Sequence, residues 1–367
     1  MKQPPCVPRN KELILMQAAL APPEQALVAW LKWRSENSAE AYQYTHNRLL
    51  PLISRRLGQS PLTQEDRAFL RGLYRYHWTR NQLLSNCAAS ILETLENHGV
   101  PTLLLKGLAL AHLTYRDLGV RPMHDFDVLV APAQRDRAVA VLEAAGWSYE
   151  PPLPALSAAH GCEFRNDKDQ RFDLHWFTTD ESRWAGADDD FWAGAATLSL
   201  GATVTRVLNS THQLLHVLVH GVKCTGASPC NWVADACAIL DSAAVIDWEE
   251  FVECARRRRV VLPIALGLRF LKESVGRPVP ESVLRELDST PVNWVDRTYF
   301  KSKIRGGTDR LAMLRPFLEY VRNERATGLG SLFGFLRFLR DRWHLQRKRQ
   351  LPGRIWARLQ KRLSGTD

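Results

Sequence analysis

The sequence predicts a mixed (α+β) protein, in which a small α/β core lies between helical segments at both ends of the chain. Apolar residues recur at the three- and four-residue spacing of helices up to about residue 98 and again from about residue 210. Between these regions, short apolar runs bounded by proline or glycine alternate with helical patterns. The chain has 367 residues, enough for two or three domains and a sizeable core.

The central region has a definite order of predicted elements. The long helix before it, "RAFLRGLYRYHWTRNQLLSNCAASILETLENHG", ends at Gly99, a common C-terminal stop. There follow a strand ("VPTLLLKG"), a helix ("LALAHLTYRDLG"), a strand ("DFDVLV") and a helix ("PAQRDRAVAVLEAAGW"). The segment "CEFRNDKDQRFDLHW" then predicts a hairpin, because two alternating arms flank a polar turn.

These patterns predict four regions along the chain. Residues 1–98 form a helical N-terminal region and residues 99–207 form the α/β core. Residues 208–330 form a helical C-terminal domain, beginning with cap-type residues at "STHQLLHVLVHGV". Residues 331–367 form a basic amphipathic tail.

The net charge of +10 is concentrated in this tail. Residues 331–363 contain ten basic residues against one acidic residue, Asp341, which accounts for nine of the ten net positive charges. The body therefore needs no polyanionic partner. As a helix, the tail could pack its apolar side on the body, lie on an anionic membrane surface, or bind RNA phosphates.

The composition favours a cytoplasmic location, with peripheral membrane contact as an option through the tail. No window approaches the roughly 18 apolar residues of a membrane span, and the start "MKQPPCVPRN" lacks the apolar core of a secretory signal. The seven cysteines include no CxxC pair, which suits reduced thiols in a cytosol.

Two aspartates stand one residue apart in "RPMHDFDVLV". On a strand, residues i and i+2 face the same side, so Asp125 and Asp127 project together while Phe126 points to the core. Bare carboxylates about 4 Å apart repel by roughly 1 to 4 kcal/mol, and one or two Mg²⁺ ions would reverse this repulsion. Asp173, on the alternating strand "RFDLHW", is available as a third carboxylate. His124 faces away from Asp125 and is expected to be structural.

The combined pattern resembles a known enzyme superfamily. "LLLKGLALAHLTYRDLGVRPMHDFDVLV", "RAVAVLEAAGW" and "FDLHW" are similar to the nucleotidyltransferases that include DNA polymerase beta. They resemble most closely the uncharacterised bacterial nucleotidyltransferase family with a Lys-Gly motif before an Arg-x-x-x-Asp-x-Asp motif. The resemblance covers roughly residues 100–250, since "HQLLHVLVH" and "WVADACAIL" are also similar to the helical part of that family.

The resemblance implies roles for individual residues. Asp125, Asp127 and Asp173 would be catalytic carboxylates that hold Mg²⁺ or Mn²⁺, with Asp173 nearest the acceptor. Lys106 and Gly107 would cradle the triphosphate, and Arg121 would contact phosphate. One departure concerns Leu108, because the superfamily usually has serine or glycine there, and a hydroxyl contact to phosphate is lost.

Four further residues are candidates for the cleft. His175 shares a face with Asp173, and His216 and His220 lie four residues apart on one helical face. Asp235 follows on the next predicted helix. A histidine on an apolar helix is more often a satisfied core residue, so the structural interpretation stands beside the functional one for each histidine.

The sequence thus predicts transfer of a nucleoside monophosphate from an NTP, with ATP favoured, to an acceptor, with release of pyrophosphate. The acceptor class stays open among a small molecule, a peptide, a protein and an RNA. Two other classes remain. One is a non-catalytic nucleotide-binding accessory protein docked to a membrane or anionic partner through its tail, and the other is an RNA-binding protein that acts through the tail.

Overall fold

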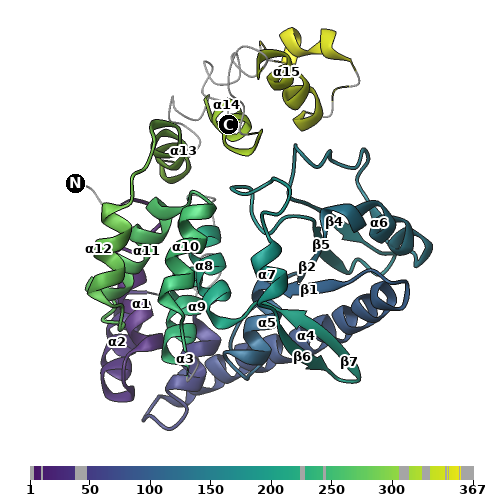
Figure 1. Ribbon diagram of the computed structural model, residues 1–367. Helices are drawn as coiled ribbons and strands as arrows, with labels where there is room; N and C mark the ends of the chain where they lie inside the picture. The colour runs from purple at the N-terminus through teal and green to yellow at the C-terminus, as the bar shows by residue number, and fades with distance from the viewer. Residues whose placement is uncertain are drawn as a thin grey trace.

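The fold is described from a computed structural model of the chain. It describes residues 4–9, 11–37, 48–223, 228–242, 245–305, 314–324, 331–343, 345, 347–354 and 356. Within these residues the predicted mixed architecture of helices and strands is confirmed (Figure 1). The last part of the predicted tail, residues 357–367, lies outside the described residues.

The N-terminal region is helical, as predicted. Its elements are α1 (Lys11–Leu20), α2 (Pro23–Glu36), α3 (Leu50–Arg56) and α4 (Gln64–Asn97). The side chain of Thr63 accepts a hydrogen bond from the Asp66 amide and so caps α4. Gly99 follows the helix with φ +67°, a conformation that glycine adopts without strain and that allows the chain to turn into the sheet.

Seven strands of the described chain form one mixed sheet in the order β3-β4-β5-β2-β1-β7-β6. The strands are β1 (Thr102–Leu105), β2 (Asp127–Val130), β3 (Ser148–Tyr149), β4 (Gly161–Arg165), β5 (Arg171–His175), β6 (Ala196–Leu200) and β7 (Thr203–Val207). β4 and β5 pair antiparallel around residues 166–170, so the predicted hairpin is confirmed. β2 pairs antiparallel with β1 and parallel with β5, which places β2 between the two.

The two faces of the sheet pack against different helices. Leu104, Val128 and Val130 contribute to a core shared with α4 and with α6 (Arg135–Ala144), which follows the short helix η2 (Pro132–Gln134). Leu103 and Leu129 point the other way, into the large core formed with the helical regions. Because side chains alternate along a strand, Asp127 lies on this second face, turned toward the helical side of the molecule.

Helices α8 to α13 form the helical side. Their bounds are α8 (Ser210–Gly221), α9 (Cys230–Asp241), α10 (Trp248–Arg257), α11 (Val261–Glu273), α12 (Glu281–Ser289) and α13 (Trp294–Ile304), and the short α5 (Lys106–Leu113) and α7 (Asp189–Ala193) lie between them and the sheet (Figure 1). Asn209 caps α8 by accepting a hydrogen bond from the His212 amide.

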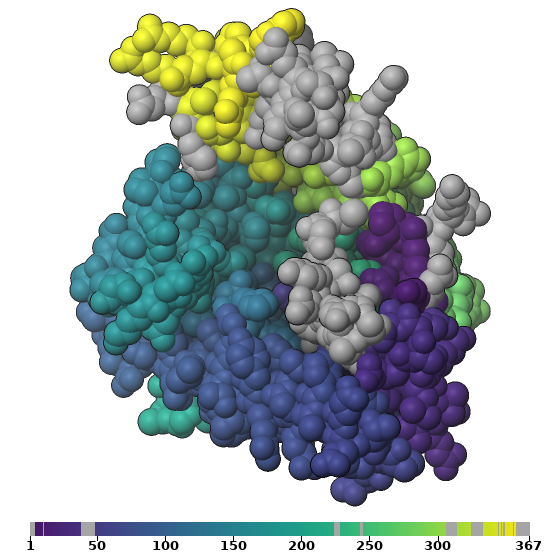
Figure 2. Space-filling model, turned by 180° about the vertical axis from the view of Figure 1, so that it is seen from behind, coloured from purple at the N-terminus to yellow at the C-terminus, as the bar shows by residue number. Residues whose placement is uncertain are grey.

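The N-terminal helices share one hydrophobic core with the C-terminal helices. Trp30 and Leu50 belong to the same buried cluster as Leu214 and Leu268, and Figure 2 shows the purple N-terminal segment beside the green C-terminal helices. The Trp232 indole on α9 donates to the Cys6 carbonyl at 2.9 Å. The two terminal regions therefore stabilise each other, and the predicted boundaries at residues 98, 207 and 330 stay predictions.

The beginning of the basic tail is helical and packs on the body. α14 (Arg315–Glu324) and α15 (Ser331–Arg342) bury Tyr320 against Phe338 and Leu339, and η4 (Lys348–Gln350) follows. Arg342 forms an ion pair with the buried Glu319 of α14 at 3.0 Å. In the part of the chain that the structure describes, no helix combines the length and apolarity needed to cross a membrane.

Candidate active site

The centre of the site is the pairing of two carboxylate-bearing strands. In the parallel pairing of β2 with β5, Asp127 lies directly opposite Asp173 and Leu129 opposite His175. Paired residues of neighbouring strands project to the same face of a sheet. The third carboxylate predicted from the sequence is therefore beside the second one, on the face turned toward the helices.

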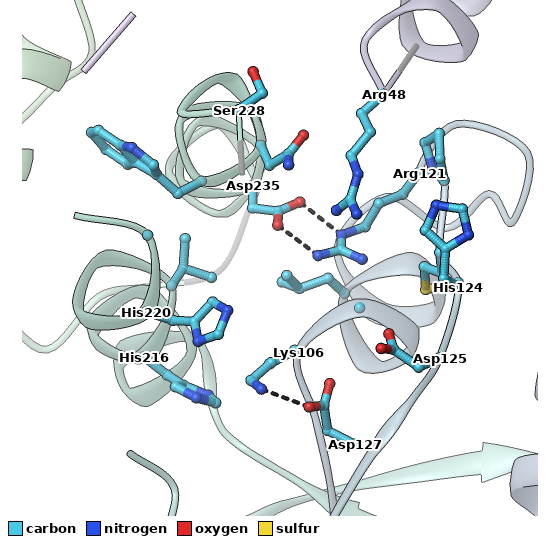
Figure 3. A pocket seen from close by; sticks show the side chains of 18 of the residues that line it. Arg48, Lys106, Arg121, His124, Asp125, Asp127, His216, His220, Ser228 and Asp235 are labelled. Carbon is cyan, nitrogen blue, oxygen red and sulfur yellow. Dashed lines mark hydrogen bonds and ion pairs between the residues drawn. The ribbon is translucent and has the colours of Figure 1, made fainter. Parts of the chain in front are cut away.

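Asp127 is buried and its Oδ1 atom has two partners. Lys106 Nζ lies 2.6 Å from Oδ1 (Figure 3). His175 Nε2 lies 2.9 Å from the same oxygen. Burial acts to raise the pKa of Asp127, but the Lys106 charge and the His175 hydrogen bond outweigh it, so the pKa falls well below its ordinary range. Asp127 is therefore ionised, and its Oδ1 atom is held by both Lys106 and His175.

The pKa of Asp173 shifts in the opposite direction, above its ordinary value. Burial, and then the negative charge of Asp127, raise its pKa to about 6. The same burial, together with the Lys106 charge, lowers the pKa of His175 to about 4. The imidazole is therefore neutral near pH 7. Its Nδ1 has no partner within the described residues, which favours the tautomer that carries the proton on Nε2 and donates it to Asp127.

Asp127, Asp173 and His175 form a group suited to a divalent cation. One ligand atom from each lies within 4.8 Å of the other two. Carboxylate oxygens are the ligands that Mg²⁺ and Mn²⁺ prefer, and an imidazole nitrogen suits transition metals. Asp125 is exposed and stays outside this group, but it lines the same cavity and points into it beside Asp127 (Figure 3). The donor set fits such a cation.

The cavity in front of these carboxylates has a volume of about 290 Å³. Its residues come from the α/β core on one side and from α8 and α9 on the other (Figure 3). The sequence-predicted residues that line it are Lys106, Gly107, Arg121, Asp125, Asp127, Asp173, His216, His220 and Asp235. Residues far apart in the chain are thus brought to one place, while His175 lies behind Asp127.

The first turn of α5 provides a glycine-dependent cradle. Lys106 begins the helix with φ +47°, an unusual backbone angle for a residue with a side chain. A Cβ atom on Gly107 would lie 2.4 Å from Arg121 NH1 and 2.8 Å from Met123 Sδ. Only glycine lets this arginine and methionine approach the helix start so closely. The helix N-terminus also offers unpaired amide groups, which favour anions.

Leu108 packs in the core. Its side chain is fully buried in the cluster between the sheet and α4. The side chain at this position therefore points away from the cavity, and the expectation that leucine removes a hydroxyl contact to phosphate here loses its geometric basis.

Arg121 is held by Asp235 across the cavity. Arg121 Nε and NH2 donate to the two carboxylate oxygens at 2.9 and 2.8 Å (Figure 3). The Tyr115 hydroxyl donates to Asp235 Oδ1 at 2.9 Å. Burial alone would lower the pKa of Arg121, yet Asp235 more than compensates and the pKa rises. Arg121 is a permanent cation with a fixed direction.

The helical wall of the cavity is formed by His216, His220 and Lys223. Burial, and then the Lys106 charge, lower the pKa of His216 well below the ordinary value. His220 is more exposed and lines the cavity. Burial also lowers the pKa of Lys223. His216 Nε2 is buried with no hydrogen-bond partner among the described residues. The His216 imidazole is therefore a neutral hydrogen-bonding group in the wall of the cavity.

Sequence reasoning missed several residues of the site. His124 was expected to be structural, but it is exposed and lines the cavity, because the chain before β2 is not yet a strand and does not alternate. Arg48 and Lys223 also line the cavity. Nothing in the sequence around Arg48 marks it as a site residue, because the segment before it contains no motif. Tyr115 was part of the quoted motif region, but its partner is 120 residues away.

A second group of possible ligands lies between α7, α8 and α10. It consists of Asp190, His212, Glu250 and Cys254. Arg258 donates to both oxygens of Asp190 at 2.8 and 2.6 Å, and Arg257 forms an ion pair with the same carboxylate. Because two guanidinium groups neutralise Asp190, this cluster is a structural ion network.

Comparisons with known proteins identify the family to which the chain belongs. Curated protein sequences give no significant match. Among solved structures, the chain resembles an antigenic nucleotidyltransferase-like protein from Paracoccidioides brasiliensis, at 10% identity and a TM-score of 0.37, over 57% of this chain and 94% of that chain. Residues 38–276 match the family described as uncharacterised nucleotidyltransferase. This match spans the α/β core and the helices that line the cavity, and the chain belongs to the uncharacterised nucleotidyltransferase family.

Proposed function

We propose that the protein transfers a nucleoside monophosphate from a nucleoside triphosphate to an acceptor and releases pyrophosphate. The observation that carries this proposal is the pairing of Asp127 with Asp173 in front of a cavity that also contains Asp125, Lys106 and Arg121. Membership of the nucleotidyltransferase family supports it. In this proposal β1, β2 and β5 form a polymerase-beta-like core, and ATP is the first triphosphate to test.

Binding of the triphosphate would depend on the cradle at α5. Arg121 NH1 lies against Gly107 in the first turn of α5, because glycine has no Cβ there, and the first turn of a helix offers free amide groups to an anion. A guanidinium group and helix amides complement phosphate oxygens in charge and in hydrogen bonding. Lys106 adds a positive charge between this cradle and Asp127. The β- and γ-phosphates would therefore lie at the start of α5, with the α-phosphate nearer the carboxylates.

Asp125, Asp127 and Asp173 would hold one or two Mg²⁺ or Mn²⁺ ions. When bound, such ions neutralise the triphosphate, lower the pKa of the acceptor hydroxyl and stabilise the departing pyrophosphate. His175 fixes the Asp127 carboxylate through Nε2. A hydrogen bond of this kind, one step behind a ligand, orients the ligand and maintains its affinity.

The acceptor oxygen would attack the α-phosphorus from the side of Asp173. A new bond forms between this oxygen and phosphorus while the bond to the bridging oxygen of pyrophosphate breaks. Asp173 would hold the metal nearest the acceptor and accept the proton of the acceptor hydroxyl, because its carboxylate lies opposite Asp127 and lines the cavity. Positioning and charge supply most of the catalysis in phosphoryl-type transfers.

The experiment compares two labels of the same nucleotide. The purified protein is incubated with Mg²⁺ or Mn²⁺, a cell extract as a source of acceptors, and ATP labelled at either the α- or the γ-phosphate. The proposal predicts that the α-label becomes attached to an acceptor and that the γ-label appears in pyrophosphate. Mass spectrometry then identifies the acceptor. Transfer of the γ-label, or binding of ATP without any transfer, would contradict the proposal.

A further inference from the structure

The Arg121 guanidinium group is held by Asp235, and the Asp235 carboxylate is in turn held by Tyr115, so three separate segments of the chain meet here. Asp235 lies on α9, and it is 114 residues away from Arg121 in the sequence. Tyr115 lies in the connection after α5, and its hydroxyl donates to the same carboxylate. Asp235 and Tyr115 are buried, with 6% and 7% of their surfaces exposed. The Asp235 carboxylate thus accepts three hydrogen bonds, and the two from Arg121 form a planar fork.

The two hydrogen bonds to Asp235 leave the third guanidinium nitrogen of Arg121, NH1, available to bind a ligand. Asp235 uses Nε and NH2 of Arg121, and NH1 points over Gly107, where an added Cβ would lie only 2.4 Å away. The guanidinium group is planar and rigid, so fixing two of its nitrogens fixes the third. Asp235 therefore sets where NH1 lies relative to the first turn of α5.

The side chain of Arg121 is ordered before any ligand binds, unlike that of an arginine that extends freely into solvent. An exposed arginine must lose rotamer freedom when its ligand binds, whereas Arg121 is ordered before binding. The carboxylate that orders it comes from α9, so NH1 keeps its position only while α9 stays docked against the chain that precedes β2 (Figure 3). Loss of the Asp235 carboxylate would leave the partly buried guanidinium group of Arg121 free to turn away from Gly107.

We propose that Asp235 and Tyr115 are positioning residues for triphosphate recognition. They hold Arg121 NH1 at the start of α5, where it contacts the β- and γ-phosphates, and they couple this contact to the docking of α9. The inference rests on the proposed function, because it assigns a role within the same nucleotide site. It makes the preference for a triphosphate over a monophosphate depend on a carboxylate that does not touch the nucleotide.

The test measures this preference directly, without an acceptor. Calorimetry with Mn²⁺ gives the Kd of a nonhydrolysable α,β-methylene ATP analogue and of AMP, for the wild type and for Asp235→Asn. We expect the ratio of the two Kd values to fall at least tenfold in Asp235→Asn, mainly through weaker binding of the triphosphate analogue. Tyr115→Phe removes one hydroxyl only, and we expect a two- to fivefold fall.

Two further variants separate positioning from general stability. Asp66 is a buried carboxylate remote from the cavity that accepts hydrogen bonds from Trp30 and Arg34, so Asp66→Asn is a matched control whose Kd ratio should equal that of the wild type. In the Arg121→Ala background, Asp235→Asn should produce no further fall, because both substitutions remove the same contact. Tyr115→Phe keeps the test available if Asp235→Asn does not fold.

The outcomes of these measurements separate the positioning role of Asp235 and Tyr115 from the proposed function. An unchanged Kd ratio in both Asp235→Asn and Tyr115→Phe, or additive effects of Arg121→Ala and Asp235→Asn, would overturn the positioning role while the proposed function stands. An equal fall in Asp66→Asn would overturn it too. A wild type that binds AMP as tightly as the triphosphate analogue would overturn both the inference and the proposed function.

Discussion

Asp127 and Asp173 lie opposite each other in the pairing of β2 with β5, and their pKa values move in opposite directions. Lys106 and His175 overcome burial at Asp127 and hold its pKa well below the ordinary value. At Asp173 burial, and then the charge of Asp127, raise the pKa to about 6. The pair is therefore strained in the absence of a cation, because two adjacent carboxylates share a face with too little positive charge.

The first prediction concerns the stability of the metal-free protein. A carboxyl group with a raised folded-state pKa contributes stability that is present below its unfolded pKa of 3.8 and is lost as the pH rises through about 6. Asp173→Asn removes this loss. We expect its Tm at pH 8 to exceed that of the wild type by roughly 2–4 °C, and the difference to vanish near pH 4.

Thermal melts in the presence of a chelator measure this difference. Asp167→Asn is the control, because Asp167 is exposed in the turn between β4 and β5, and its Tm should follow the wild type at each pH. A constant gap between Asp173→Asn and the wild type from pH 4 to pH 8 would contradict the assigned repulsion.

The second prediction concerns Gly107. Gly107→Ala places a Cβ at 2.4 Å from Arg121 NH1, so the arginine must move away from α5. We expect affinity for a nonhydrolysable ATP analogue to fall at least tenfold, as measured by calorimetry. Gly72→Ala is the control, since no atom lies within 4 Å of its added Cβ, and it should stabilise α4 by about 1 kcal/mol. Equal nucleotide affinity in both variants would argue against the cradle.

The third prediction concerns Leu108, where related enzymes usually carry a small or hydroxyl-bearing residue. Because its side chain is fully buried, we expect Leu108→Ser to lower the free energy of unfolding by about 3–5 kcal/mol and to leave nucleotide affinity no better. Urea denaturation and calorimetry measure the two quantities. Leu83→Ser, at a residue 62% exposed on α4, should change neither. Tighter nucleotide binding by Leu108→Ser would show that the hydroxyl reaches phosphate.

The fourth prediction concerns His175 as the support of Asp127. Its Nε2 donates to Asp127 Oδ1 at 2.9 Å, so His175→Phe removes the donor while His175→Gln can retain one. We expect Mn²⁺ affinity, followed by electron paramagnetic resonance, to fall about 10–100-fold in His175→Phe and only a few-fold in His175→Gln. An equal loss in both variants would indicate that the imidazole nitrogen itself binds the metal.

Much of the fold followed from local patterns. The strand "DFDVLV" and the hairpin around "NDKDQ" have short-range signals, namely alternation and a polar turn. The hairpin is where the sequence predicted it, and the strand is present but begins only at Asp127. The long helix α4 likewise follows from its periodicity and from Gly99. The shared core of the N- and C-terminal helices could not be predicted, because Trp30 and Leu268 meet through tertiary packing that leaves no mark on local spacing.

The candidate site likewise contains residues that local sequence patterns predict and contacts that they do not. Strand geometry does not place Asp125 beside Asp127, because β2 begins at Asp127, although both residues line the cavity. Asp173 was predicted because it lies on another alternating strand. The partners of these residues depend on long-range contacts. The hydrogen bonds that Arg121 and Tyr115 donate to Asp235 therefore could not be predicted from the sequence. Leu108 gave a misleading signal, since a departure from a motif says nothing about the direction in which the side chain points.

The most direct test of the central claim is the location of metal and nucleotide in a crystal grown with Mn²⁺ and a nonhydrolysable ATP analogue. Anomalous scattering at the manganese edge identifies the metal positions without reference to the coordinates of the chain. We expect manganese to be bound directly by the carboxylates of Asp127 and Asp173, with the triphosphate at the start of α5 beside Arg121. A nucleotide bound elsewhere, or manganese absent from these two carboxylates, would contradict it.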